Sequence, residues 1–319
     1  PGPYPPHRRA RRMKKRPLLV IFLTVFLDLV GFGIVFPLLP KYVSNFGAPA
    51  WMIGLIVASY SLMQFVFAPR WGRLSDRIGR RPVLLISTAG FALSYVLFAL
   101  GSGAAHAGTA LGLIVASRVV GGICGANLTV AQAYIADVSP PEQRSKRMGL
   151  IGMAFGLGFI CGPLIAVVAL LKAGLAGPGW VAAALSAANL ILMWCVLPES
   201  RTGAPPAAAR RPGLSGVRDV LARPRIGLLV ALFFLATFAF TCFETTLGLL
   251  VARNFHFAPG GADAEIATAF LFAFCGLIGA FVQGGPLGRL VRRRGEPRLL
   301  AGGPVVRAVS PAPPPFLGG

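Results

Sequence analysis

Three observations predict that this sequence forms an all-α protein embedded in a membrane. Hydrophobic residues make up 55% of its 319 residues and charged residues only 13%, about half of the charged share of an ordinary soluble domain. The mean hydropathy is +0.71. The apolar residues also gather in runs of about 20 residues, the length at which a helix crosses the hydrocarbon core of a bilayer. These runs lack the alternation of a membrane β-strand, so helices are the expected elements.

The apolar runs define eight expected membrane-spanning helices. In chain order they cover residues 17–39, 51–69, 82–101, 109–137, 147–171, 178–197, 226–251 and 266–287. The first run is not interpreted as a signal peptide, because it is longer than the apolar part of such a peptide and contains Asp28. The chain is therefore expected to cross the membrane many times.

The connections between these runs predict the domain organisation. We expect a basic tail (1–16), a bundle of six helices (17–197), a linker rich in Pro, Ala and Arg (198–225), a partial second bundle of two helices (226–300) and a final tail outside both bundles (301–319). The segment "GRLVRRRGEPRLL" at 288–300 echoes "GRLSDRIGRRPVLL" at 72–85, and each follows the second run of its bundle. This repeat predicts two related bundles.

The second bundle would need four further helices to match the first, and residues 301–319 contain no apolar run. We therefore interpret the sequence as a truncated form of a longer protein. Met13, which is followed by "KKRPLL", has the form of a natural start, and the sequence leaves both Pro1 and Met13 open as the native start.

The basic residues predict the orientation of the helices. Nearly all of the 31 Lys and Arg residues lie in the N-terminal tail or in the connections after the second, fourth, sixth and eighth runs. Because Lys and Arg are retained on the cytoplasmic side, the N-terminus and the linker are expected in the cytoplasm, with the plasma (bacterial inner) membrane as the location. The same clustering between apolar runs argues against nucleic acid as a partner, despite the net charge of +21.

The connection after the second run carries the most specific motif. The stretch "GRLSDRIGRRPVLL" resembles the loop motif of the major facilitator superfamily, G-x-x-x-D-R-x-G-R-R, at every position. The matching residues are Gly72, Asp76, Arg77, Gly79, Arg80 and Arg81. The resemblance implies a cytoplasmic gate in which Asp76 meets a helix N-terminus or an Arg across the interface between the bundles. For Arg80 and Arg81, a role in topology alone is the alternative.

Further segments are similar to motifs of the proton-coupled drug antiporters of that superfamily. They are "LDLVGFGIVFPLLP" (27–40), "SRVVGGICGANLTVAQAYIAD" (117–137), "GLIGMAFGLGFICGP" (149–163) and, as in the tetracycline/proton exporters, "LPES" (197–200). The resemblance implies a major facilitator helical bundle with a complete N-terminal six-helix half and the start of the second half. It also implies proton-coupled efflux of drugs or small organic molecules by alternating access. Ser94 stands where tetracycline exporters carry an acid, which argues against tetracycline as the substrate.

Two charged residues lie near the membrane midplane, where charges are costly and mark functional sites. Asp28 falls about eleven residues into the first run and Arg118 about nine residues into the fourth, at a rise of about 1.5 Å per residue. We expect both to take part in proton coupling. A static ion pair between them is the alternative.

Polar residues at helical spacing predict a substrate cavity. Thr24 shares a helical face with Asp28, Tyr60 with Gln64, and Gln132 with Arg118. Glu244, in the outer part of the seventh run, either attracts a cationic substrate or lies exposed at a helix end, and the sequence leaves both open. The fifth run contributes small residues at near-fourfold spacing, a pattern that lets helices approach closely. The residues of this antiporter motif are Gly149, Gly158, Gly162 and Pro163.

The remaining patterns exclude several classes of site. The five cysteines lie far apart in apolar runs, so neither a disulfide framework nor a metal site is expected. No cofactor, catalytic or ATP-binding motif is found. The expected partners are a small-molecule substrate, a proton and membrane lipid. Two alternatives to antiport remain: a facilitator or symporter of a small metabolite, and a truncated membrane product that transports nothing.

Overall fold

The computed structural model describes residues 16–49, 51–125, 127–200, 222–255 and 262–284. Its elements are α1 (Arg16–Val35), the 3₁₀ turn η1 (Phe36–Leu38), α2 (Leu39–Asn45), α3 (Trp51–Ile78), α4 (Arg80–Ser102), α5 (Ala107–Cys124), α6 (Asn127–Val138), α7 (Pro141–Ala173), α8 (Gly177–Val196), α10 (Pro224–Asn254) and α11 (Ala262–Gly284). Within the described residues, seven helical stretches are long and apolar enough to cross a membrane, and α11 is not among the seven. The predicted all-α membrane fold is confirmed, and the eighth predicted run corresponds to α11.

Two predicted helices are interrupted. The first run consists of α1 followed by η1 and α2, because Pro37 and Pro40 lack the N–H groups that a continuous helix needs. The fourth run consists of α5 and α6, which are separate helices ending at Cys124 and beginning at Asn127. Gly125 is the C-cap of α5, and glycine is a poor helix former.

The stretch at 72–81, which we expected to be part of the connection between the second and third runs, is almost entirely helical. Residues 72–78 are the last two turns of α3, and α4 begins at Arg80. The chain reverses at Gly79 alone, which has a φ of 104°. Only glycine adopts this conformation without strain. The chain thus reverses within the expected connection, but the connection is much shorter than we expected.

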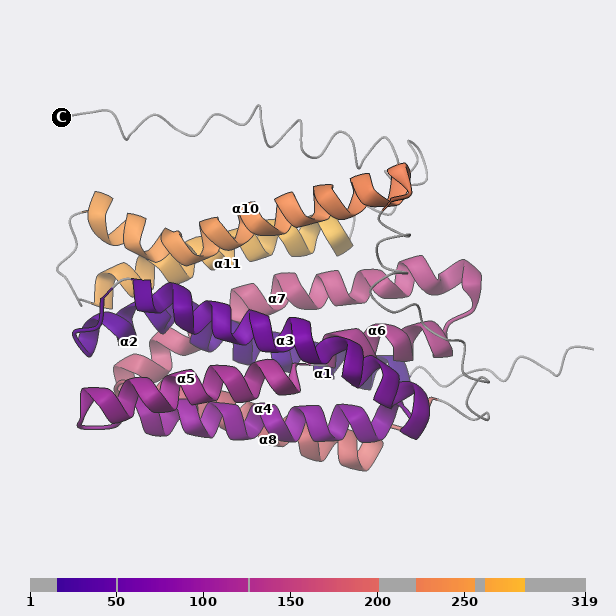
Figure 1. Ribbon diagram of the computed structural model, residues 1–319, viewed down its shortest axis with the longest axis horizontal. Coiled ribbons are helices and arrows are strands. Elements are labelled where there is room, and N and C mark those ends of the chain that lie inside the picture. The colour runs from indigo at the N-terminus through magenta and orange to yellow at the C-terminus, as the bar shows by residue number, and fades with distance from the viewer. Residues whose placement is uncertain (1–15, 50, 126, 201–221, 256–261, 285–319) are drawn as a thin grey trace, which may run out of the picture.

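The helices form one bundle and an adjoining pair (Figure 1). In Figure 1 α10 and α11 run along one side, and α7 lies between this pair and the helices α1, α3, α4, α5 and α8. We name the two ends of the bundle after features that lie there. At the Gly79 end, α3 finishes and α4 starts. The opposite end is the α2 end.

Small residues bring α7 close to α1 on one face and to α11 on the other. A Cβ atom at Gly162 would lie 2.7 Å from the Cα atom of Gly33, and one at Gly158 would lie 2.8 Å from the Cβ of Leu29. On the α11 side, Gly276 meets the backbone oxygen of Gly156. The predicted close approach is therefore present. Gly149 takes no part in it, because a Cβ there would meet open space.

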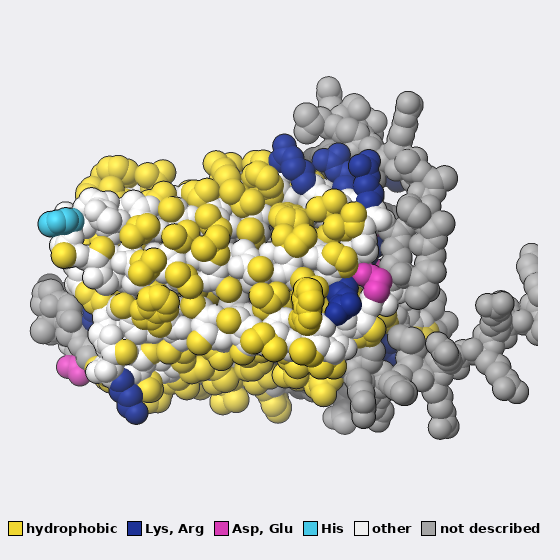
Figure 2. Space-filling model, turned by 90° about the horizontal axis from the view of Figure 1, so that it is seen from below, with side chains coloured by type: hydrophobic (Ala, Val, Ile, Leu, Met, Phe, Trp, Pro, Cys, Tyr) yellow, Lys and Arg dark blue, Asp and Glu magenta, His cyan; other side chains and the backbone are white. Residues whose placement is uncertain are grey.

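The visible surface is apolar along the bundle and basic at one end. Figure 2 shows hydrophobic side chains over the length of the helices and most of the Lys and Arg side chains at one end. Large side chains such as Phe65 and Phe233 are 80% and 75% exposed. An exposed apolar belt of this kind fits lipid rather than water.

Candidate functional site

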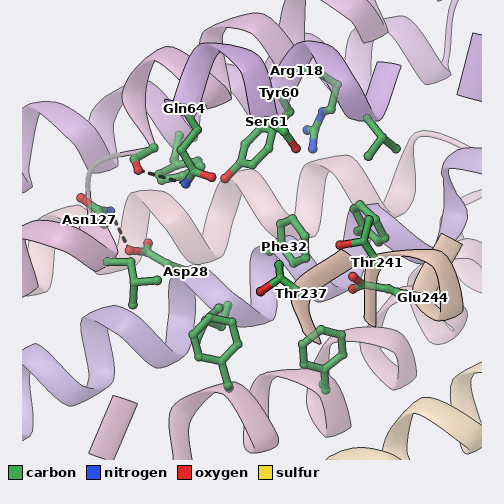
Figure 3. A pocket seen from close by; sticks show the side chains of 18 of the residues that line it. Asp28, Phe32, Tyr60, Ser61, Gln64, Arg118, Asn127, Thr237, Thr241 and Glu244 are labelled. Carbon is green, nitrogen blue, oxygen red and sulfur yellow. Dashed lines mark hydrogen bonds between the residues drawn. The ribbon is translucent and has the colours of Figure 1, made fainter. Parts of the chain in front are cut away.

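A cavity of about 320 Å³ lies between the first bundle and α10 (Figure 3). Six phenylalanines supply much of its apolar wall: Phe32, Phe36, Phe91, Phe155, Phe159 and Phe240. Its polar lining consists of Asp28, Tyr60, Ser61, Gln64, Arg118, Asn127, Thr237, Thr241 and Glu244. A mostly apolar pocket with a few polar groups is the usual form of a small-molecule site. Residues of the first bundle and of α10 thus share this cavity.

Asp28 is held by side-chain amides from two other helices. Asn127 in α6 donates its amide N–H to Oδ2 of Asp28 at 2.6 Å, and Asn189 in α8 donates to Oδ1 at 3.1 Å. The amide of Asn127 also donates to Oγ1 of Thr88 in α4 at 2.8 Å. Two helices thus hold the carboxyl group directly, and α4 contributes through Asn127. The amides fix the position of the carboxyl group without supplying a counter-charge.

Arg118 lies in the same cavity but does not pair with Asp28. Its side chain is only 3% exposed, its Nε donates to Oγ of Ser117 at 3.3 Å, and its Cζ lies 5.4 Å from the ring centre of Phe98. Among the described residues, no ion pair joins Asp28 and Arg118. Figure 3 shows them toward different ends of the cavity. The static ion pair that the sequence left open is therefore not formed in this structure.

Glu244 projects from α10 and is buried. It is 8% exposed and lines the cavity. This placement rules out an exposed residue at a helix end, and attraction of a cationic substrate by Glu244 stays a prediction. Tyr60 and Gln64 also line the cavity as predicted, and Gln64 donates to the backbone oxygen of Gly125 at 3.1 Å.

Two predicted lining residues are elsewhere. Thr24 is fully buried but does not line the cavity, and its backbone oxygen instead accepts a hydrogen bond from Asn189 at 3.2 Å. Gln132 is exposed. It was placed on the face of Arg118 by counting along one continuous helix, and the break between α5 and α6 ends that periodicity.

The motif residues at the Gly79 end form a charge cluster around Arg80. Its guanidinium contacts Asp76 at 2.7 Å, Asp137 of α6 at 3.0 Å and Oγ of Ser75 at 2.6 Å. These partners all belong to the first bundle. The described contacts place Asp76 in an ion pair with Arg80, four residues along the chain and beyond the reversal at Gly79, and the expected contact across the interface between the bundles stays a prediction. Among the other motif residues, Gly72 lies within α3, Arg77 is exposed, and Arg81 donates to the backbone oxygen of Trp194 at 2.6 Å.

Glu199 caps the first turn of α4 from a distant part of the chain. Its carboxylate accepts the backbone N–H of Arg80 at 2.9 Å and of Arg81 at 3.0 Å. Gly79 makes room for it, because a Cβ there would lie 2.5 Å from Oε2 of Glu199. An anion at a helix N-terminus satisfies free N–H groups and complements the helix dipole. The sequence showed Glu199 only within the resemblance of "LPES", and its spacing gave no sign of this role.

We expect Glu199→Ala to lower the stability of the purified protein. The change removes both acceptors from the start of α4. The loss of a helix cap lowers the free energy of unfolding by about 1–2 kcal/mol. The thermal unfolding midpoint in detergent measures the effect. Gln132→Ala, at an exposed position, is the matched control, and equal midpoints for the two variants would contradict the capping role.

At the α2 end, an ion pair joins the two sets of helices. Nζ of Lys41 in α2 lies 2.8 Å from Oε1 of Glu265 in α11, and both side chains are mostly buried, at 13% and 14% exposed. The α2 end is therefore tied across the interface. The Arg80 cluster lies at the other end.

Comparison with known proteins places these features in a family. The sequence pattern of the Major Facilitator Superfamily matches residues 21–312. Major facilitator superfamily domain-containing protein 10 of Bos taurus is 32% identical over 332 residues, which cover 88% of this chain and 69% of the relative. The class E tetracycline resistance protein of Escherichia coli is 32% identical over 296 residues, covering 90% and 69%.

The crystal structure of the human organic anion transporter MFSD10 (TETRAN) has a TM-score of 0.66 and 28% identity, and the match covers 86% of this chain and 72% of that one. A D-xylose–proton symporter has a TM-score of 0.60 at 19% identity, with 82% and 65% covered. The second likeness shows a shared fold.

Proposed function

The chain belongs to the Major Facilitator Superfamily of membrane transporters, and we propose that it exports drugs or other small organic molecules in exchange for protons. The observation that carries this proposal is Asp28, a carboxyl group that lines the cavity and is held there by two neutral amides. Such a group can lose and regain a proton without breaking an ion pair. The substrate would occupy the same space.

In this proposal the cavity works by alternating access. The ion pair between Lys41 and Glu265 would hold the α2 end closed, and rocking of α10 and α11 against the first bundle would expose the cavity to each side in turn. A proton moving down a potential of about 100 mV supplies about 2.3 kcal/mol. The Arg80 cluster would brace the ends of α3, α4 and α6 as one unit during this motion, and exposed Arg77 would contact lipid phosphates.

Transport of organic anions is a second candidate function. Arg118 supports it, because its buried guanidinium lines the cavity without an acidic partner among the described residues. One relative is titled an organic anion transporter, whereas others are titled tetracycline resistance proteins. The two candidate functions differ in the charge of the transported molecule, and both place that molecule in the same cavity.

Proteoliposomes with an imposed pH gradient test the proposed exchange. We expect ethidium, a permanent cation, to accumulate on the acidic side, and the accumulation to vanish when an ionophore abolishes the gradient. A facilitator would equilibrate ethidium with or without the gradient. A symporter would move it toward the alkaline side.

The orientation of the chain is a separate proposal, with the N-terminus and the Gly79 end in the cytoplasm. In a variant whose native cysteines are replaced by alanine, Ala105→Cys should react with an impermeant thiol reagent added to intact cells. Gln143→Cys should react only after the cells are opened. Both positions are exposed, so access to the reagent depends on the side of the membrane. If Gln143→Cys alone were labelled in intact cells, the chain would have the opposite orientation to the one proposed.

A further inference from the structure

Two buried charges in the cavity have no partner for part of their charged group. Nη2 of Arg118 and Oε1 of Glu244 lack a hydrogen-bond partner among the described residues. Both side chains are more than nine-tenths buried, at 3% and 8% exposed, and both line the cavity. Figure 3 places them toward the same end of it, with Asp28 and Asn127 toward the other.

An unpaired charge away from water is costly, so a buried guanidinium and a buried carboxylate each call for a partner of opposite sign. Asp28 does not serve Arg118, because no ion pair joins the two among the described residues. Among the described residues Glu244 forms no ion pair with Arg118 or with any other base. A ligand carrying both an anionic and a cationic group would satisfy the two residues together.

Much of the wall of this cavity is aromatic. Phe32, Tyr60 and Phe240 line the cavity together with the two charges, and flat apolar surfaces of this kind hold the body of a ligand by burial and ring stacking. Thr241, which also lines the cavity, adds a hydroxyl that can donate or accept.

We propose that the cavity binds an aromatic or otherwise apolar zwitterion, with its anionic group at Arg118 and its ammonium group at Glu244. This inference rests on the proposed function only in that the bound molecule is the cargo. Asp28 stays free for the proton in this arrangement. The cavity of about 320 Å³ suits a body of two rings.

Three probes of one shape test the charge requirement on the unaltered chain. The first is a biphenyl with an aminomethyl group at one end and a carboxylate at the other. The second is its methyl ester, which carries only the positive charge. The third is its N-acetyl derivative, which carries only the negative charge. Binding to the purified protein in lipid nanodiscs is measured by calorimetry, with no gradient present.

We expect the zwitterion to bind at least about tenfold more tightly than either singly charged probe, since about 1.4 kcal/mol corresponds to a factor of ten. Glu244→Gln keeps the shape of the side chain and removes its charge. It should lower the affinity for the zwitterion and for the ester about tenfold and leave the affinity for the N-acetyl probe unchanged. Asp263→Asn, which removes an exposed acid from the first turn of α11, should change none of the three affinities.

Equal affinity for the three probes, absence of binding, or an equal loss of all three affinities in Glu244→Gln would overturn the inference. Because the first comparison uses the unaltered protein, it does not depend on the folding of any variant. Binding is measured without transport. A chain that selects the zwitterion yet moves no proton would refute only the exchange mechanism, and a chain that exchanges ethidium for protons but ignores the zwitterion would refute only this inference.

Discussion

Replacing Asp28 with asparagine is expected to abolish transport driven by a pH gradient while leaving the protein folded. The new side chain has nearly the same shape but cannot carry a proton. The amides of Asn127 and Asn189 can accommodate it, because Oδ1 of each is buried and has no hydrogen-bond partner among the described residues. A rotated amide would present that oxygen to the new N–H₂ group. Ethidium accumulation in proteoliposomes with a pH gradient should fall to the level of empty vesicles.

Asp263→Asn is the matched control for this experiment, because it removes an acid of the same type from an exposed position outside the cavity. It should transport as well as the unaltered protein. Gradient-driven accumulation by Asp28→Asn at the normal rate would remove Asp28 from the mechanism. Thermal unfolding of both variants shows whether any loss comes from misfolding.

A single methyl group at Gly162 is expected to loosen the contact between α1 and α7. The Cβ of Gly162→Ala would lie 2.7 Å from two backbone atoms of Gly33, so one of the two helices has to move. Overpacking of this kind costs about 1–3 kcal/mol. The unfolding midpoint of the purified protein should fall, and binding in the cavity should weaken, because α1 and α7 both line it.

Gly149→Ala tests the same change on the same helix without the clash. A Cβ at Gly149 meets nothing within 4 Å, and alanine is the better helix former by about 1 kcal/mol. Its midpoint should stay equal or rise slightly. If both variants unfold at the same temperature, the close packing of Gly162 against Gly33 does not stabilise the protein.

The fold and the charged part of the site could be predicted because a membrane protein shows both plainly in its sequence, as long apolar runs and as rare charges within them. In lipid, a long apolar run without strand alternation forms a helix, because its backbone groups need hydrogen-bond partners within the same segment. A charge within such a run stands out, so Asp28 and Arg118 were found from residue type and depth alone, whereas the sequence left the role of Glu244 open. Their placement in one cavity follows the prediction.

The partners of these charges could not be predicted, because they depend on how the helices pack. Asn127 is one polar residue within an apolar run, and nothing in its spacing links it to Asp28. Asn189 is likewise a polar residue within an apolar run, and it holds the other oxygen of the same carboxyl group. Gln132 was misplaced because no residue pattern showed that α5 and α6 are separate helices.

The central claim is that organic solutes and protons pass through this cavity in opposite directions, and the most direct test reverses the usual gradient. Proteoliposomes are loaded with ethidium and a pH-sensitive dye, clamped at zero membrane potential with potassium and valinomycin, and diluted into ethidium-free buffer of the same pH. As ethidium leaves, the account predicts that protons enter and the lumen acidifies, and that Asp28→Asn vesicles show no change. Ethidium efflux with a constant or rising internal pH would contradict it.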